Sequence, residues 1–151
     1  FVLAGNGSQK KKLGEKIKSL NLQNVEILDA IPKQELADFV AACDVSLVTI
    51  ANYKILERNS ANKFFDSLSA GKPVLLNYSG WQRAILEENN AGFGCDLCNL
   101  EQFVEKVKYL ESNRNELAQM GQHARKAALE QFPRDKLAAS VLDLIEKQIR
   151  K

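Results

Sequence analysis

One polar segment carries residues whose types and spacing suit the binding of a phosphorylated ligand. Asn62 and Lys63 lie in the first turn of a predicted helix, and Asp66 follows one turn later. Unpaired amides at a helix N-terminus, together with a lysine, can meet a diphosphate. The carboxylate of Asp66 can accept hydrogen bonds from two sugar hydroxyls. The same pattern also fits a surface loop with solvated charges, so the spacing alone leaves both interpretations open.

The segments around these residues predict an α/β fold, because apolar runs of strand length alternate with stretches of helical period. Such alternation implies right-handed βαβ units and a parallel sheet. We therefore predict a Rossmann-like doubly wound parallel sheet with extra C-terminal helices. The expected strands are Phe1–Ala4, Val25–Leu28, Val45–Ile50, Pro73–Asn77 and Phe93–Cys95. The expected helices are Gln9–Leu20, one opening at Ile31, Asn62–Ala70, Gln82–Asn89, Leu100–Leu110, Asn115–Gln131 and Arg134–Ile149.

Composition is typical of one soluble globular domain. The chain has 151 residues, of which 45% are hydrophobic and 26% charged, values usual for such a domain. The net charge of +2 lacks the basic excess of nucleic-acid-binding domains, so we expect no nucleic-acid partner. Three cysteines favour a reducing compartment over a disulfide framework. No apolar run approaches the roughly 20 residues of a transmembrane helix.

The predicted fold also indicates where a ligand would bind. Open parallel sheets bind ligands at the carboxyl ends of their strands. Three loops leave strand ends there and enter helices, namely Gly5–Ser8, Ala51–Ala61 and Tyr78–Trp81. We therefore expect an anion site formed by these loops.

The segment Asn62–Val74, which reads Asn-Lys-Phe-Phe-Asp-x-Leu-x-Ala-Gly-Lys-Pro-Val, resembles the signature of group 1 glycosyltransferases. These enzymes belong to glycosyltransferase family four, have the GT-B fold and retain the anomeric configuration. Weaker matches flank the signature in the family's order, at Leu3–Gly7, Val25–Leu28, Glu88–Gly94 and Met120–Arg125. The resemblance thus runs along most of the chain.

The resemblance implies a set of site residues. Asp66 and Arg58 are the candidate catalytic residues, although Arg58 stands where the family has a sugar-binding acid. Arg58 could instead pair with a phosphate or an acidic sugar, and its neighbour Glu57 could supply the carboxylate after a one-residue shift. The candidate donor-binding residues are Gly5, Asn6, Gly7, Ile31, Ser60, Ala61, Asn62, Lys63 and Asp66.

The implied reaction is the retaining transfer of a sugar from a nucleotide-diphosphate sugar to a glycan or lipid-linked acceptor. The pathway would be polysaccharide biosynthesis of the capsule or O-antigen type. The chain has no Asp-x-Asp motif, so we expect neither a metal nor another cofactor. Because the chain opens directly in an apolar strand, which we expect to be buried, we expect residues 1–151 to be a C-terminal donor-binding domain. It would lack the first strand–helix unit and the N-terminal acceptor domain and would be inactive alone. The expected location is the cytoplasm, including the inner face of the membrane.

Several alternatives stay open. The chain could be a degenerate GT-B half that binds nucleotide sugars and regulates, a reading that Arg58 favours. A nicotinamide enzyme is disfavoured because Lys10 occupies the third glycine position after Gly5 and Gly7. A flavodoxin-like or receiver-like module would need an acidic or flavin-stacking pocket, and neither is evident. Cys95 and Cys98 form a CxxC pair that lacks a thioredoxin-like context. The basic cluster Lys10, Lys11, Lys12, Lys16 and Lys18 is either a solvated face or a contact with anionic membrane.

Overall fold

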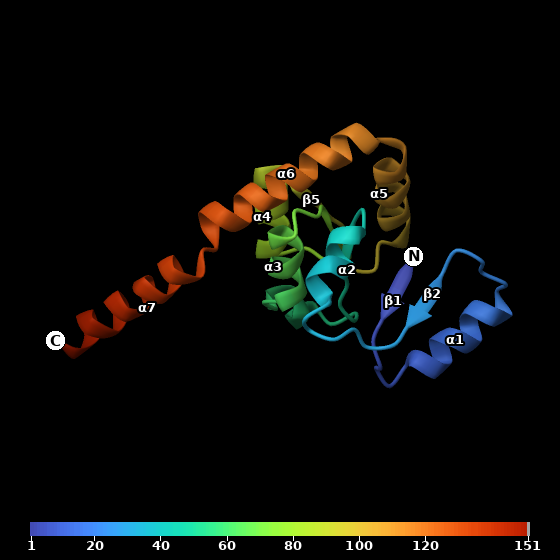
Figure 1. Ribbon diagram of the computed structural model, residues 1–151, viewed down its shortest axis with the longest axis horizontal. Helices are drawn as coiled ribbons and strands as arrows, with labels where there is room; N and C mark the ends of the chain where they lie inside the picture. Colours follow the sequence, from blue (N-terminus) through green and yellow to red (C-terminus); the bar gives the residue numbers. More distant parts are fainter. Residues whose placement is uncertain (151) are drawn as a thin grey trace. The chain divides into compact units, whose positions relative to one another are not determined.

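The computed structural model describes residues 1–150, which divide into two compact units. The first unit, Phe1–Phe39, is a βαβ element (Figure 1). Strands β1 (Val2–Ala4) and β2 (Glu26–Leu28) pair in parallel, and α1 (Lys10–Ser19) connects them. Residue Val2 lies opposite Glu26, and Ala4 lies opposite Leu28.

No residue of the first unit is buried. Phe1 and Leu3, expected in a buried strand, are 56% and 41% exposed, so that expectation is wrong for the described structure. Two short strands and one helix enclose too little volume for a core, which is a general limit of very small units.

The second unit begins at Val40 and holds a three-stranded parallel sheet. Strand β4 (Val74–Leu76) lies between β3 (Ser46–Val48) and β5 (Gly92–Gly94). Its elements before the C-terminal helices are the 3-10 helix η1 (Lys54–Arg58), α3 (Asn62–Ser69) and α4 (Trp81–Asn89). Helices α5 (Leu100–Ser112), α6 (Arg114–Gln131) and α7 (Arg134–Ile149) follow, and α2 (Leu36–Ala42) spans the boundary between the units.

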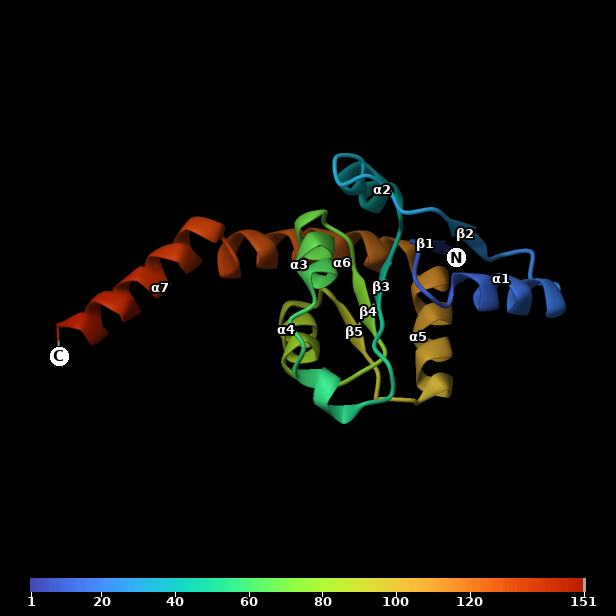
Figure 2. The same ribbon diagram turned by 90° about the horizontal axis from the view of Figure 1, so that it is seen from below.

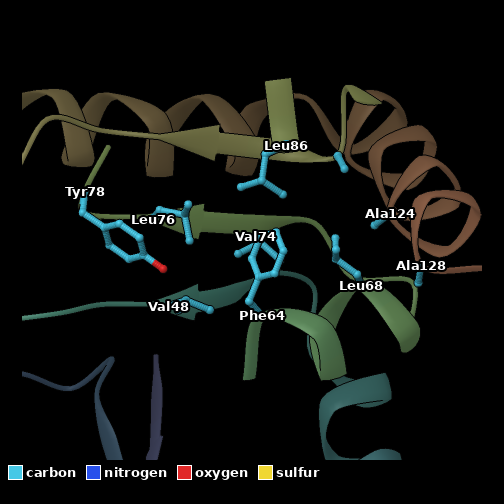
Figure 3. Packing of buried hydrophobic residues seen from close by; sticks show 10 residues of the cluster. Val48, Phe64, Leu68, Val74, Leu76, Tyr78, Leu86, Ala124 and Ala128 are labelled. Atoms are coloured by element: carbon cyan, nitrogen blue, oxygen red, sulfur yellow. The ribbon is translucent and has the colours of Figure 1, made fainter. Parts of the chain in front are cut away.

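Both faces of the three-stranded sheet are covered, as is usual for parallel strands. On one face, Phe64 and Leu68 of α3 and Leu86 of α4 pack against β4 (Figure 3). The second cluster joins Leu110 of α5 to Met120 of α6 and the half-buried Phe93 of β5. Figure 2 shows α5 on the opposite side of the sheet from α3 and α4. The second unit therefore has the three layers of a doubly wound domain.

The predicted α/β fold with parallel strands and C-terminal helices is confirmed. The predicted strands and helices all exist, with shifted ends, and β5 is an edge strand as expected. The hydrogen-bonded pairing is divided between two sheets, β1–β2 and β3–β4–β5, one in each unit. Among residues 1–150, no helix combines the length and apolarity needed to cross a bilayer.

Tyr78 provides a test of the core by pH. Its side chain is fully buried and donates a hydrogen bond to Oε1 of Gln82, and burial raises the pKa of Tyr78 to about 12. An unfolded tyrosine ionises near 10, so Tyr78 contributes stability that is complete below pH 10 and is lost as pH rises through 12. We expect the stability gap between wild type and Tyr78→Phe to narrow over this range in denaturant titrations. If the stabilities of wild type and Tyr78→Phe change in parallel from pH 9 to 12, Tyr78 is not the group whose ionisation destabilises the fold.

Candidate functional site

Helix α3 begins without a side-chain cap. Its N-cap residue Ala61 has an extended backbone, with φ −73° and ψ 119°, and makes no side-chain hydrogen bond to the helix. The amides of the first turn, including those of Asn62 and Lys63, are therefore not capped by a side chain. Such amides, together with the positive end of the helix dipole, suit an anion.

The body of α3 is held firmly against the sheet. Phe64 and Leu68 have no exposed surface. Ser67 Oγ lies 2.6 Å from Ser46 Oγ of β3 and 2.5 Å from the carbonyl oxygen of Lys63. Gly71 ends the helix with φ 67°, as its position predicts. These contacts fix the direction in which the first turn of α3 points.

The candidate site side chains on this helix and before it point into solvent. Arg58, Ser60, Asn62, Lys63 and Asp66 are exposed, and Ala61 is half-buried. Within residues 1–150, the side chains of Arg58, Asn62, Lys63 and Asp66 make no hydrogen bond or ion pair. Lys63 and Asp66 lie three residues apart and so share one face of α3. Their polar groups are available to a ligand.

The loop expected over Ala51–Ala61 is partly helical. It contains η1, which ends at Arg58 and whose C-cap residue Asn59 donates its amide to the carbonyl of Leu56 at 2.9 Å. Asn77, just after β4, braces the start of this loop. Its Oδ1 accepts from the amide of Ile50 at 2.8 Å, and its Nδ2 donates to the Ile50 carbonyl at 3.0 Å. The side chain thereby extends the β3–β4 pairing beyond the strands.

A glycine brings the next loop against η1. Gly80 has φ 113°, and a Cβ at this residue would lie 2.6 Å from the carbonyl oxygen of Glu57 and 3.6 Å from its Cβ. A larger residue could not approach so closely. Glu57 is half-buried at this contact, whereas Arg58 is exposed. The loops that follow β3 and β4 therefore meet, as the carboxyl-end prediction requires.

Trp81 packs against the core and keeps part of its side chain exposed. Its ring lies 6.1 Å from Phe64 and 6.0 Å from Phe65, between centroids, and Phe65 contacts Phe132 at 5.1 Å. It closes one edge of the core. It also stays 38% exposed at the start of α4.

The sequence placed Gly80 and the η1 segment in loops of the expected anion site. It did not predict Asn77, the 3-10 helix or the contact between Gly80 and Glu57. A signal existed for Asn77, because a polar residue directly after an apolar parallel strand lies at the ligand-binding edge of the sheet. The Gly80 contact had no local signal, since Glu57 is 23 positions away in the sequence.

The remaining predicted donor residues belong to the first unit. Gly5 has φ 148°, and no other group lies within 4 Å of a Cβ built at Gly5 or Gly7. Asn6 Oδ1 accepts from Lys10 Nζ at 2.9 Å, and Lys10 also pairs with Asp29 at 2.5 Å, which lowers the pKa of Asp29. The backbone of this loop is thus open on one side. Ile31 is half-buried in the segment after β2.

Two grooves of the second unit lie away from the candidate site. One, of about 690 Å³, is lined by Lys72, Arg114 and Arg125 near the amino ends of the strands. Arg125 donates to the Ser69 carbonyl at 2.5 Å and Arg114 pairs with Asp44 at 3.0 Å. Cations are favourable at the C-terminal end of α3, so the helix itself accounts for Lys72 and Arg125. The other groove, of about 770 Å³, includes His123.

The cysteines and the histidine do not converge. Cys95 is buried, where desolvation raises the pKa of its thiol, and Cys98 is exposed. His123 Nδ1 lies 3.3 Å from the Asn90 carbonyl. In the described part of the chain, no three His, Cys, Asp or Glu residues are grouped as metal ligands.

Several solved structures share the fold of this chain. HepE of Anabaena in complex with UDP-glucose gives a TM-score of 0.79 at 20% identity, over 97% of this chain and 40% of HepE. HepE with UDP gives 0.80 at 18%, with the same coverage. A mutant of TarM of S. aureus, with Fondaparinux, alpha-GlcNAc-glycerol and UDP, gives 0.79 at 18%, over 95% of this chain and 28% of TarM. The chain thus spans less than half of either protein, and the likeness concerns the fold.

Sequence comparisons identify the family. Comparison with curated proteins gives no match. The family model described as glycosyl transferases group 1 matches residues 1–127, which include both βαβ regions and all the candidate site residues. The chain therefore belongs to the group 1 glycosyl transferases.

Proposed function

We propose that this chain is the donor-binding part of a retaining, metal-independent glycosyltransferase of family four. The enzyme transfers a sugar from a nucleotide-diphosphate sugar to a glycan or lipid-linked acceptor in polysaccharide biosynthesis. The observation that supports this most is the start of α3, where the first-turn amides have no side-chain cap. Within residues 1–150, the exposed side chains of Lys63 and Asp66 have no hydrogen-bond or ion-pair partner. The acceptor side and the upstream strand–helix unit lie in other parts of the protein, and residues 1–151 are inactive alone.

In this proposal the bond between the anomeric carbon and a diphosphate oxygen breaks, and the nucleoside diphosphate leaves with the electron pair. An acceptor hydroxyl oxygen bonds to the anomeric carbon on the same face, and its proton passes to the departing diphosphate. The amides of Asn62 and Lys63 and the Lys63 ammonium stabilise the charge that develops on that diphosphate. Asp66 accepts hydrogen bonds from hydroxyls of the donor. Ser60 and Ala61 line the phosphate side. In the first unit, the Gly5–Gly7 backbone and Ile31 are further candidate contacts of the donor.

Arg58 has a role of its own in this proposal. It is exposed at the end of η1 and pairs with no acid in the described part of the chain, so its guanidinium is available to the diphosphate or to an acidic donor sugar. Glu57, the neighbour of Arg58, lies against Gly80 and is the candidate for the sugar-binding carboxylate that Arg58 cannot supply. The protein acts in the cytoplasm, and the lysines of α1 other than Lys10 remain exposed for contact with anionic lipid at the inner face of the membrane.

A catalytically degenerate module that binds nucleotide sugars is the second candidate, favoured by Arg58 in place of the expected acid. Both candidates predict nucleotide binding, and only the first predicts turnover.

The test is calorimetry of the full-length protein with UDP, GDP and ADP, followed by transfer or donor hydrolysis in the presence of EDTA. We expect one nucleotide to bind and the matching sugar donor to be consumed with a product of unchanged anomeric configuration. Binding without turnover supports the regulatory module. Failure of all three nucleotides to bind contradicts both candidates.

A further inference from the structure

Arg83, in the first turn of α4, ties three segments at the carboxyl ends of β4 and β5. Its Nε donates to Glu87 Oε1 at 2.6 Å within the helix. Its Nη1 donates to Asp96 Oδ1 at 3.0 Å and lies 3.3 Å from Ser79 Oγ. Ser79 precedes α4 and Asp96 follows β5, so one guanidinium connects both loops.

The stem of Arg83 lies directly over β5. A Cβ at Gly94 would be 2.4 Å from Cγ and 2.5 Å from Cδ of Arg83. A glycine at this strand position thus makes room for the side chain, which is only 27% exposed. The guanidinium is therefore held by packing as well as by its hydrogen bonds.

The network extends from Asp96 into the next helix. The backbone N–H of Asp96 donates to the side-chain Oε1 of Gln102 at 2.7 Å. The backbone N–H of Gln102 in turn donates to Oδ1 of Asn99, the N-cap residue of α5, at 3.0 Å. The loop after β5 is thereby fixed at both ends. Arg83 thus has a rigid anchor on one side and the turn Ser79–Gly80 on the other.

The same turn contacts η1. Ser79 is bonded to the Arg83–Asp96 pair, and the next residue, Gly80, lies against the Glu57 carbonyl. Movement of Ser79 would shift Gly80 and remove the surface on which η1 rests. The position of Arg58, and of the loop that leads into α3, therefore depends on contacts that Arg83 makes from outside the site.

We infer that Arg83 is a positioning residue for the donor site, because it fixes the Ser79–Gly80 turn that supports η1. This inference rests on the proposed function for its consequence in ligand binding, but not for its effect on η1. Arg83 itself need not touch the ligand.

The experiment compares Arg83→Ala, Arg83→Lys and Arg125→Ala in the full-length protein. Arg125→Ala is the matched control, because it removes another arginine that bonds to a neighbouring segment, the Ser69 carbonyl at the C-terminal end of α3. Hydrogen exchange of the backbone over 53–61 is measured without ligand, and UDP affinity is measured by calorimetry. Lysine keeps the charge but not the planar fork that reaches several acceptors.

We expect Arg83→Ala to accelerate exchange in 53–61 and to weaken UDP binding by about tenfold, within the range for residues that act on a site without contacting the ligand. Arg83→Lys should fall between wild type and Arg83→Ala in both measurements. Arg125→Ala should change neither, even where its melting temperature falls equally. Unchanged exchange in 53–61 overturns the inference, as does faster exchange with unchanged UDP affinity. If wild type binds no UDP, the uridine donor is excluded, and the exchange arm still decides the role of Arg83.

Discussion

Replacing Gly92 by alanine is expected to lower the free energy of unfolding by about 3 kcal/mol or more, since overpacking against fixed backbone is among the largest single-residue effects. Gly92 has φ 150°, and a Cβ there would lie 2.0 Å from the Val74 carbonyl oxygen and 2.8 Å from its nitrogen. Val74 is the residue that pairs with Gly92 in the sheet. The β4–β5 ladder cannot accept a side chain without separating. Denaturant unfolding of wild type and Gly92→Ala measures the difference in the free energy of unfolding.

Gly14→Ala is the control for that measurement. Gly14 lies within α1, and nothing lies within 4 Å of a Cβ built there. Alanine in a helix interior is favoured over glycine by about 1 kcal/mol, so this variant should be neutral or slightly stabilised. If Gly92→Ala and Gly14→Ala are destabilised equally, the loss of stability in Gly92→Ala does not come from the contact with the Val74 backbone.

Asp66→Ala is expected to weaken nucleotide binding by between about tenfold and about a hundredfold, the range for a charged hydrogen-bonding partner. Turnover with the matching donor should fall at least as far. Stability should stay within about 0.5 kcal/mol of wild type, because exposed side chains contribute little to folding and the exposed side chain of Asp66 bonds to no group among residues 1–150. Calorimetry and initial rates on the full-length protein measure the two effects.

Glu105→Ala is the matched control, since Glu105 is another exposed acid within a helix, on α5 at the other face of the sheet. It should leave binding and rate unchanged. Asp66→Asn adds a finer comparison, because the amide oxygen keeps one acceptor and loses the charge. If Asp66→Ala binds nucleotide and turns over as wild type does, the assignment of the donor site to α3 is wrong.

The sequence predicted those elements whose signals are local. Helix α3 starts at Asn62 as predicted, and Gly71 adopts the left-handed conformation that its place after an apolar helix requires. Strand ends were less accurate, because ladder hydrogen bonds depend on the neighbouring strand. The 3-10 helix over Lys54–Arg58 was missed, since its segment reads as an ordinary polar loop.

Features that depend on distant residues could not be predicted. The Gly80–Glu57 contact and the Arg83–Asp96 pair join loops that only the folded sheet brings together. The exposure of Phe1 and Leu3 was also missed, because an apolar strand pattern indicates a surface that suits burial but not what covers it. The roles of Gly5, Asn6, Gly7 and Ile31 stay predictions, as do those of Arg58, Ser60, Ala61, Asn62, Lys63 and Asp66.

The way α3 is anchored has a consequence for how this protein can change over evolutionary time. The residues that hold the helix, Phe64, Ser67 and Leu68, all point inward. The residues proposed to bind the donor, Asn62, Lys63 and Asp66, are exposed, and their side chains contribute little to folding. Mutations at the outward positions can therefore accumulate and be selected for a new sugar while the fold keeps its margin of stability. Arg58, exposed at the end of η1 just before α3, is an example of such a change, because it stands where the family has an acid.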